Sequence, residues 1–163
     1  MKATIRFILL YLALTSNAQA IVGGVVDLSN KYSSVGYTFT TGGSLGSVVA
    51  LDSQWVLTAA HVVDEPPSFL VMGDPNTGKE GLYFFIDQVI PHFNYVPGEF
   101  HDDLALIKLS ASDPIDPTRG DVDASFATLS NVDLGGGLPA TATLTGYGLT
   151  AFDGTVDTLL RHK

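Results

Sequence analysis

The stretch QWVLTAAH, at residues 54–61, decides the fold class of this chain. Its Trp, Val, Leu and Thr residues are typical of a β-strand. The two alanines that follow end this run, and residues 59–63 have room for one helical turn. The pattern therefore predicts a short buried strand that delivers His61 to the turn at its end.

Similar short runs recur along the chain and are separated by glycine- and proline-rich turn signals. No long window has the 3.6-residue apolar period of a helix, and we find no internal repeat. We therefore predict an all-β protein, an antiparallel barrel or sandwich. The predicted strands cover residues 46–51, 54–58, 68–72, 82–91, 104–109 and 140–147.

The first 20 residues are typical of a secretory signal peptide. Lys2 and Arg6 precede an apolar run at residues 7–14, and an A-x-A cleavage pattern follows at residues 18–20. The apolar run is too short to span a bilayer, which disfavours the alternative of a membrane anchor. We expect a protein that is secreted or periplasmic and that has no membrane association after cleavage.

The charge of the chain argues against a nucleic-acid partner. Its formal net charge is −9, and removal of residues 1–20 would leave six basic residues against 17 acidic ones, a net charge of −11. A nucleic-acid site needs a basic face. The chain also has no cysteine, so disulfides cannot support the fold.

Four short strings stand in a fixed order: IVGG at 21–24, WVLTAAH at 55–61, DLALIKL at 103–109 and TGYGLT at 145–150. Together they resemble the trypsin-like (chymotrypsin/S1) family of serine proteases, with Tyr147 in the place of the family's tryptophan. The resemblance implies the double β-barrel of that family. It also implies that IVGG is the mature N-terminus, which cleavage after Ala20 would itself expose.

The resemblance also implies two catalytic residues. A serine hydroxyl needs a neighbouring base, and histidine suits this role because its ordinary pKa lies near neutrality. A carboxylate on the far ring nitrogen fixes the tautomer and stabilises the imidazolium. By resemblance, His61 is the general base and Asp103 its orienting partner. Asp102 is interpreted as a solvated loop acid, and His92, His101 and His162 as surface residues.

The family's serine, in a G-D-S-G-G motif, has no counterpart in the sequence. We therefore expect the N-terminal portion of a peptidase S1 domain over residues 21–163. A first six-stranded barrel would span about 21–135, the second barrel would begin at about 136–163, and most of it would be missing. The chain would be a secreted serine endopeptidase truncated before its nucleophile and inactive alone, acting on protein or peptide substrates if completed. The alternative is a catalytically dead, protease-like binding module.

Three further patterns are interpreted conservatively. The string GGSLG at residues 42–46 matches a nucleophile-elbow pattern but lacks its strand–turn–helix context, so we predict a turn before a strand. Residues 74–80 offer oxygen ligands, yet a solvated turn is favoured, and no metal site or cofactor is assigned. By resemblance, Gly46 and Val62 occupy positions that often hold a disulfide in the family.

Overall fold

The computed structural model describes residues 24–73, 81–99, 101–119, 124–130 and 143–147. Within these residues, seven strands form one antiparallel sheet in the order β5-β4-β1-β2-β3-β7-β6. The strands and the one 3₁₀ turn are β1 (Val35–Thr40), β2 (Leu45–Ala50), β3 (Trp55–Thr58), η1 (Ala60–Val63), β4 (Pro67–Met72), β5 (Leu82–Phe84), β6 (Ile86–Pro91) and β7 (Ala105–Leu109).

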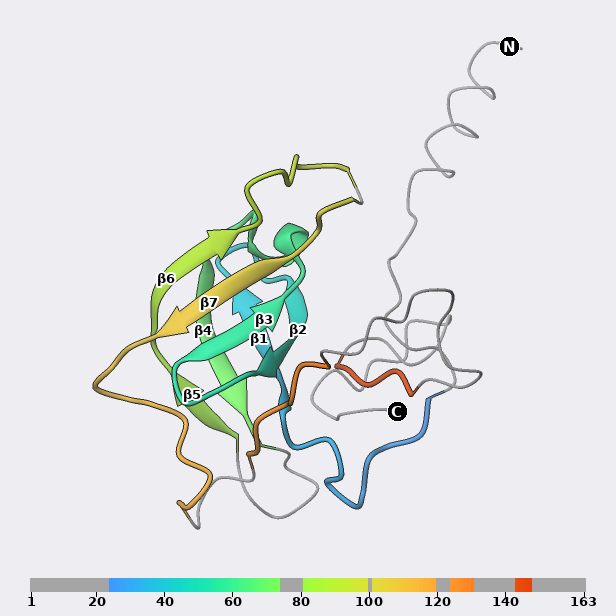
Figure 1. Cartoon of the computed structure of the whole chain (residues 1–163), viewed down its shortest axis with the longest axis vertical. Helices are drawn as coiled ribbons and strands as arrows, with labels where there is room; N and C mark the ends of the chain where they lie inside the picture. Colours follow the sequence, from blue (N-terminus) through green and yellow to red (C-terminus); the bar gives the residue numbers. More distant parts are fainter. Residues whose placement is uncertain (1–23, 74–80, 100, 120–123, 131–142, 148–163) are drawn as a thin grey trace, which may run out of the picture.

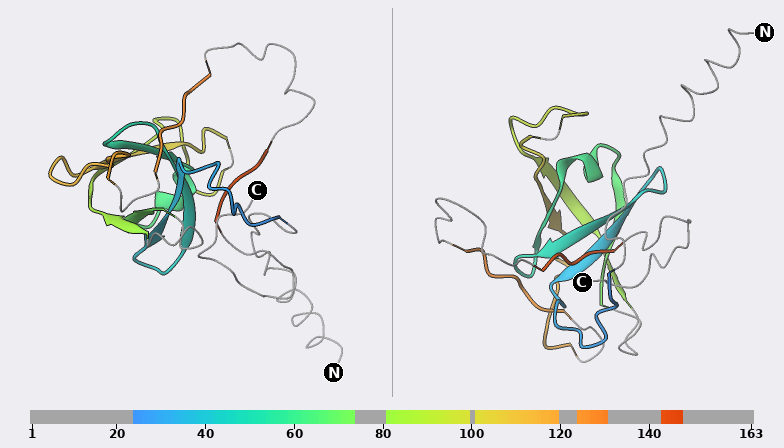
Figure 2. Two further views of the ribbon diagram at one scale, coloured as in Figure 1. Left: turned by 90° about the horizontal axis from the view of Figure 1, so that it is seen from below. Right: turned by 90° about the vertical axis from the view of Figure 1, so that its right-hand side faces the viewer.

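The sheet curls into a barrel (Figures 1 and 2). Its two edge strands, β5 and β6, are consecutive in the chain and are separated by Phe85 alone. One bent segment therefore pairs with β4 at one end of the sheet and with β7 at the other. Counted as a single strand, it makes the barrel six-stranded, and the all-β trypsin-like prediction is confirmed.

The core lies inside the barrel. Burial alternates along β2, β3 and β7, so that every second side chain points inward. Burying one large aliphatic or aromatic side chain contributes about 1.5–3 kcal/mol. The fully buried members of this cluster are Val48, Ala50, Val56, Ala60, Leu70, Met72, Phe84, Ile107, Leu109 and Ile115.

Two predictions about strands were wrong. The sequence analysis omitted β1, whose residues are buried on both faces and so show no alternation of burial. Its β-branched and aromatic composition, VGYTFT, was the available signal. A strand over residues 140–147 was predicted, but residues 143–147 contain only an isolated bridge at Gly146, and 140–142 lie outside the described residues.

Residues 143–147 pack on the outside of the barrel (Figure 2). The ring of Tyr147 is 2% exposed and lies 4.8 Å from that of Tyr37 on β1. Its hydroxyl donates to the carbonyl of Gly73 at 3.1 Å, and its backbone N–H donates to Ser47 Oγ at 2.9 Å. This segment is therefore joined to β2 and to the end of β4.

None of the helical structure in the described ranges is long and apolar enough to cross a bilayer. The signal peptide predicted at residues 1–20 lies outside the described residues.

Candidate active site

His61 lies on η1, directly after β3. Ala59 keeps an extended backbone, with φ −75° and ψ 145°, and the chain then turns. The side chains of Ala60 and Val63 are buried, and they pack one side of the turn against the core. The His61 side chain is left 57% exposed. The prediction of a helical turn around His61 is confirmed.

Asp103 reaches the same place from the start of β7. Thr58 at the end of β3 pairs with Ala105 at the start of β7, so the residue two positions before Ala105 lies beside η1. Asp102 precedes it in the left-handed region, with φ 55°. The N–H of Leu104 donates to the carbonyl of Asp102 at 2.8 Å, which closes this tight turn. The turn aims the Asp103 carboxylate at η1.

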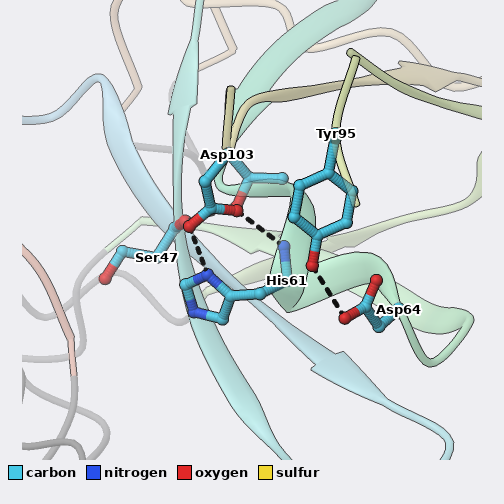
Figure 3. Close-up of polar contacts among 6 residues, drawn as sticks. Ser47, His61, Asp64, Tyr95 and Asp103 are labelled. Carbon is cyan, nitrogen blue, oxygen red and sulfur yellow. Dashed lines mark hydrogen bonds and ion pairs between the residues drawn. The ribbon is translucent and has the colours of Figure 1, made fainter. Parts of the chain in front are cut away.

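The Asp103 carboxylate holds His61 at two points (Figure 3). Its Oδ1 accepts the backbone N–H of His61 at 2.8 Å. Its Oδ2 lies 2.7 Å from the Nδ1 atom of the His61 ring. A carboxylate in this position favours the tautomer with the proton on Nδ1 and leaves Nε2 free to accept another. The arrangement can therefore serve as an oriented general base.

Local interactions lower the pKa of Asp103. Burial is the largest influence and by itself raises the pKa, since the side chain is only 18% exposed. The hydrogen bonds from the backbone and ring of His61, its charge and a bond from the Ala60 backbone outweigh this effect and bring the pKa below its ordinary value of 3.8. The carboxylate is therefore ionised wherever histidine titrates.

This shift predicts how acid affects folding. Above about pH 5 the carboxylate is ionised in both the folded and unfolded states, and its stabilising contribution is complete. As the pH falls through the lower, folded-state pKa of Asp103, protonation removes that contribution. We expect Asp103→Asn to lose less free energy of unfolding than the wild type between about pH 5 and pH 2, measured by urea denaturation.

The control is Asp102→Asn, because the Asp102 carboxylate faces His92 and His101 instead of η1. Parallel acid-dependence curves for the wild type and Asp103→Asn would contradict the prediction.

A hollow of about 320 Å³ opens beside His61. It is lined by the β1–β2 turn and by η1 with the residues that follow it. The lining residues are Thr40, Ser44, Leu45, His61, Val62, Asp64 and Glu65. The exposed histidine is therefore accessible to a molecule bound from outside.

Comparison with known proteins identifies the family. The family model described as Trypsin matches residues 21–163. The chain belongs to the trypsin family. It is 28% identical to Trypsin eta of Drosophila melanogaster, in an alignment covering 92% of this chain and 60% of that protein. It is 34% identical to Serine protease SP24D of Anopheles gambiae, over 58% of this chain and 36% of that protein. The chain thus spans about 60% or less of the length of these relatives.

Among the described residues, His92, His101 and Asp102 do not join the His61–Asp103 pair. His92 Nδ1 lies 3.7 Å from Asp102 Oδ1, and the exposed His101 contacts both Asp102 and Glu99. His101, at 66% exposure, fits its surface interpretation, whereas the His92 side chain is half-buried at 33% exposure. His162, residues 21–23 and residues 74–80 lie outside the described residues. Within the described part of the chain, no three metal-ligating side chains form a group that could hold a metal ion.

The string GGSLG begins in the turn between β1 and β2 and runs into β2, in agreement with the predicted turn before a strand. The Gly43 N–H donates to the Thr40 carbonyl at 3.0 Å, and Gly43 has a positive φ of 85°. Ser44 is followed by β2 and not by a helix, so it does not stand on a nucleophile elbow.

Gly46 and Val62, the positions of the absent trypsin-family disulfide, are in contact. A Cβ atom added at Gly46 would clash with Val62 Cγ1. The valine side chain therefore fills the space beside the glycine, and this packing links β2 to η1. The two residues are complementary in size.

We expect Gly46→Ala to lower the free energy of unfolding by about 1–3 kcal/mol, because overpacking forces the strand and η1 apart. Urea denaturation of Gly46→Ala, Val62→Ala and the double variant measures the effect as a double-mutant cycle. The double variant should regain part of the loss, because Val62→Ala removes the clashing methyl groups. Strict additivity of the two losses would count against this packing account.

Sequence reasoning missed two residues beside the pair. Tyr95 Oη donates to Asp64 Oδ2 at 2.8 Å, and Asp64 directly follows η1 (Figure 3). Neither residue belongs to a string that resembles the family, and only the folded chain brings them together. The tyrosine in NYV, before the turn at Pro97-Gly98, was the one available signal.

Proposed function

We propose that this chain is the histidine- and aspartate-bearing portion of a secreted serine endopeptidase. The observation that carries the proposal is the pair of hydrogen bonds by which the Asp103 carboxylate holds the backbone N–H and the ring Nδ1 of His61. A binding module has no need for an oriented, accessible imidazole, whereas a serine protease depends on one. Membership in the trypsin family supports the same function.

In the proposed mechanism, Nε2 of His61 takes the proton of a serine hydroxyl as that oxygen attacks the scissile carbonyl carbon. Asp103 stabilises the imidazolium that forms, and the proton then passes to the leaving amine. We place the nucleophile in sequence that follows residue 163, because the chain spans only 60% of Trypsin eta. The substrates are proteins or peptides, and no metal or cofactor takes part.

The proposal includes a division of the chain. Residues 1–20 form a signal peptide, residues 21–135 the first barrel, and residues 136–163 the start of the second. N-terminal sequencing of the secreted protein should find Ile21 first. Any other first residue would contradict this cleavage site.

A fluorophosphonate probe, which labels activated serines, tests the function. We expect no labelling of the 163-residue chain and strong labelling of the product of the full transcript, if that transcript encodes a G-D-S-G-G segment. Labelling of the 163-residue chain would refute its inactivity alone. A folded, secreted full product that takes no label would favour the alternative, a catalytically dead binding module.

A further inference from the structure

The hydrogen bond between Tyr95 and Asp64 joins the two segments that carry His61 and Asp103. Asp64 is the residue immediately after η1, on which His61 lies. Tyr95 lies in the loop between β6 and β7, which also contains Asp103. The bond between the two side chains, at 2.8 Å, is therefore a second link between the same segments, separate from the His61–Asp103 pair (Figure 3).

The segment that holds His61 has little support of its own. It is a single turn of four residues, and its N-cap residue, Ala59, makes no side-chain capping bond. The His61 N–H in its first turn donates to Asp103, a residue of another segment. So short a helix is not stable by itself, because it has too few internal hydrogen bonds to offset the entropy of ordering. Its position must come from contacts with neighbouring segments. The described contacts of this kind include buried Ala60 and Val63, the packing of Val62 against Gly46, the Asp103 carboxylate and the bond from Tyr95 to Asp64.

Tyr95 is well placed to supply such a contact, because it is itself anchored. Its ring packs against the main core cluster. Its backbone N–H donates to the carbonyl of His92 at 2.9 Å, and the N–H of His92 donates to the carbonyl of Leu104 at 2.8 Å. The Tyr95 backbone is thus linked through His92 to Leu104, the residue after Asp103, while its ring rests on the core.

The Tyr95 hydroxyl remains a hydrogen-bond donor over the whole working range of a histidine base. Desolvation is the main influence that raises its pKa to about 12, followed by the hydrogen bond to Asp64 and the charges of Asp64 and Asp103. The proton needed for the bond is therefore present at neutral and at moderately alkaline pH.

We propose that Tyr95, through its hydrogen bond to Asp64, is a positioning residue that holds the turn bearing His61 in register with Asp103. The inference rests on the proposed function, since register between base and carboxylate matters most for proton transfer. Tyr95 itself need not touch the reacting atoms. The readouts below require neither a serine nor a substrate, so they remain valid if the protease assignment fails.

The test is proton NMR on the full chain with Tyr95→Phe, which keeps the ring and removes only the hydroxyl. Two signals report on the pair: the low-field resonance of the His61 Nδ1 proton, and hydrogen exchange of the His61 backbone amide, which donates to Asp103. We expect the amide to exchange about tenfold faster, as for loss of one hydrogen bond to a charged acceptor. The Nδ1 resonance should broaden or disappear.

Three variants complete the test. Tyr83→Phe makes the same chemical change at a 63% exposed tyrosine on β5 and should leave both His61 signals unchanged. Asp64→Ala should reproduce the effect of Tyr95→Phe. Asp64→Asn retains an acceptor for the phenol and should restore most of the protection.

Two outcomes would overturn the proposal. One is unchanged His61 signals in both Tyr95→Phe and Asp64→Ala. The other is a uniform acceleration of exchange across the barrel amides, because that would show a general loss of stability and no specific effect on His61.

Discussion

Replacing Asp103 with asparagine in the proposed full-length protease is expected to lower kcat by about 10⁴-fold, the loss typical of this change in such a triad. The contacts of Asp103 give the reason. The amide oxygen would take the place of Oδ1, which accepts the His61 backbone N–H. The amide NH₂ would then face Nδ1 as a donor. It would favour the ring tautomer whose proton is on Nε2, and that nitrogen could no longer accept the proton of the nucleophile.

The measurement is steady-state cleavage of a peptide substrate by the protein that contains this chain and the proposed serine segment. Asp102→Asn is the matched control. Asp102 is the neighbour of Asp103 in the sequence, but its carboxylate contacts His92 and His101 instead of His61. The control should keep near wild-type kcat. Equal activity of the two variants would remove Asp103 from the mechanism.

The second large effect concerns the closure of the barrel. Phe84 is 1% exposed and ends β5, one residue before the bend that leads into β6. Truncating a buried phenylalanine leaves a cavity and removes apolar burial, so Phe84→Ala should lower the free energy of unfolding by about 3–5 kcal/mol. Native domains have a free energy of unfolding of only about 5–15 kcal/mol, so this loss is a large fraction of the stability of the domain.

Phe85→Ala is a matched control for the neighbouring position. The Phe85 side chain is 71% exposed, and its loss should change stability by less than about 0.5 kcal/mol. Urea denaturation of both variants, followed by tryptophan fluorescence of Trp55, measures the difference. Equal losses would contradict the arrangement in which one bent segment closes the barrel.

The sequence predicted the parts of the fold that depend on local pattern. The strand before His61 and the turn around it were readable, because strand-forming residues give way abruptly to two alanines. The meeting of His61 with Asp103 was predicted from resemblance. Its physical basis, the antiparallel pairing of β3 with β7, depends on contacts between residues about 50 positions apart in the sequence.

Other features could not be predicted in this way. Strand β1 is buried on both faces, so the expected alternation is missing. The bond from Tyr95 to Asp64 joins residues 31 positions apart, and no local pattern indicates it. The size match between Gly46 and Val62 likewise exists only after β2 and η1 have come together.

The central claim is that His61, held by Asp103, is the base of a serine protease. The most direct test compares fluorophosphonate labelling of the proposed full-length product with and without His61→Ala. Losing the base of such a triad costs about 10⁶-fold in turnover, so labelling should fall below detection while the protein stays folded. Equally rapid labelling of the wild type and the folded His61→Ala protein would contradict the claim.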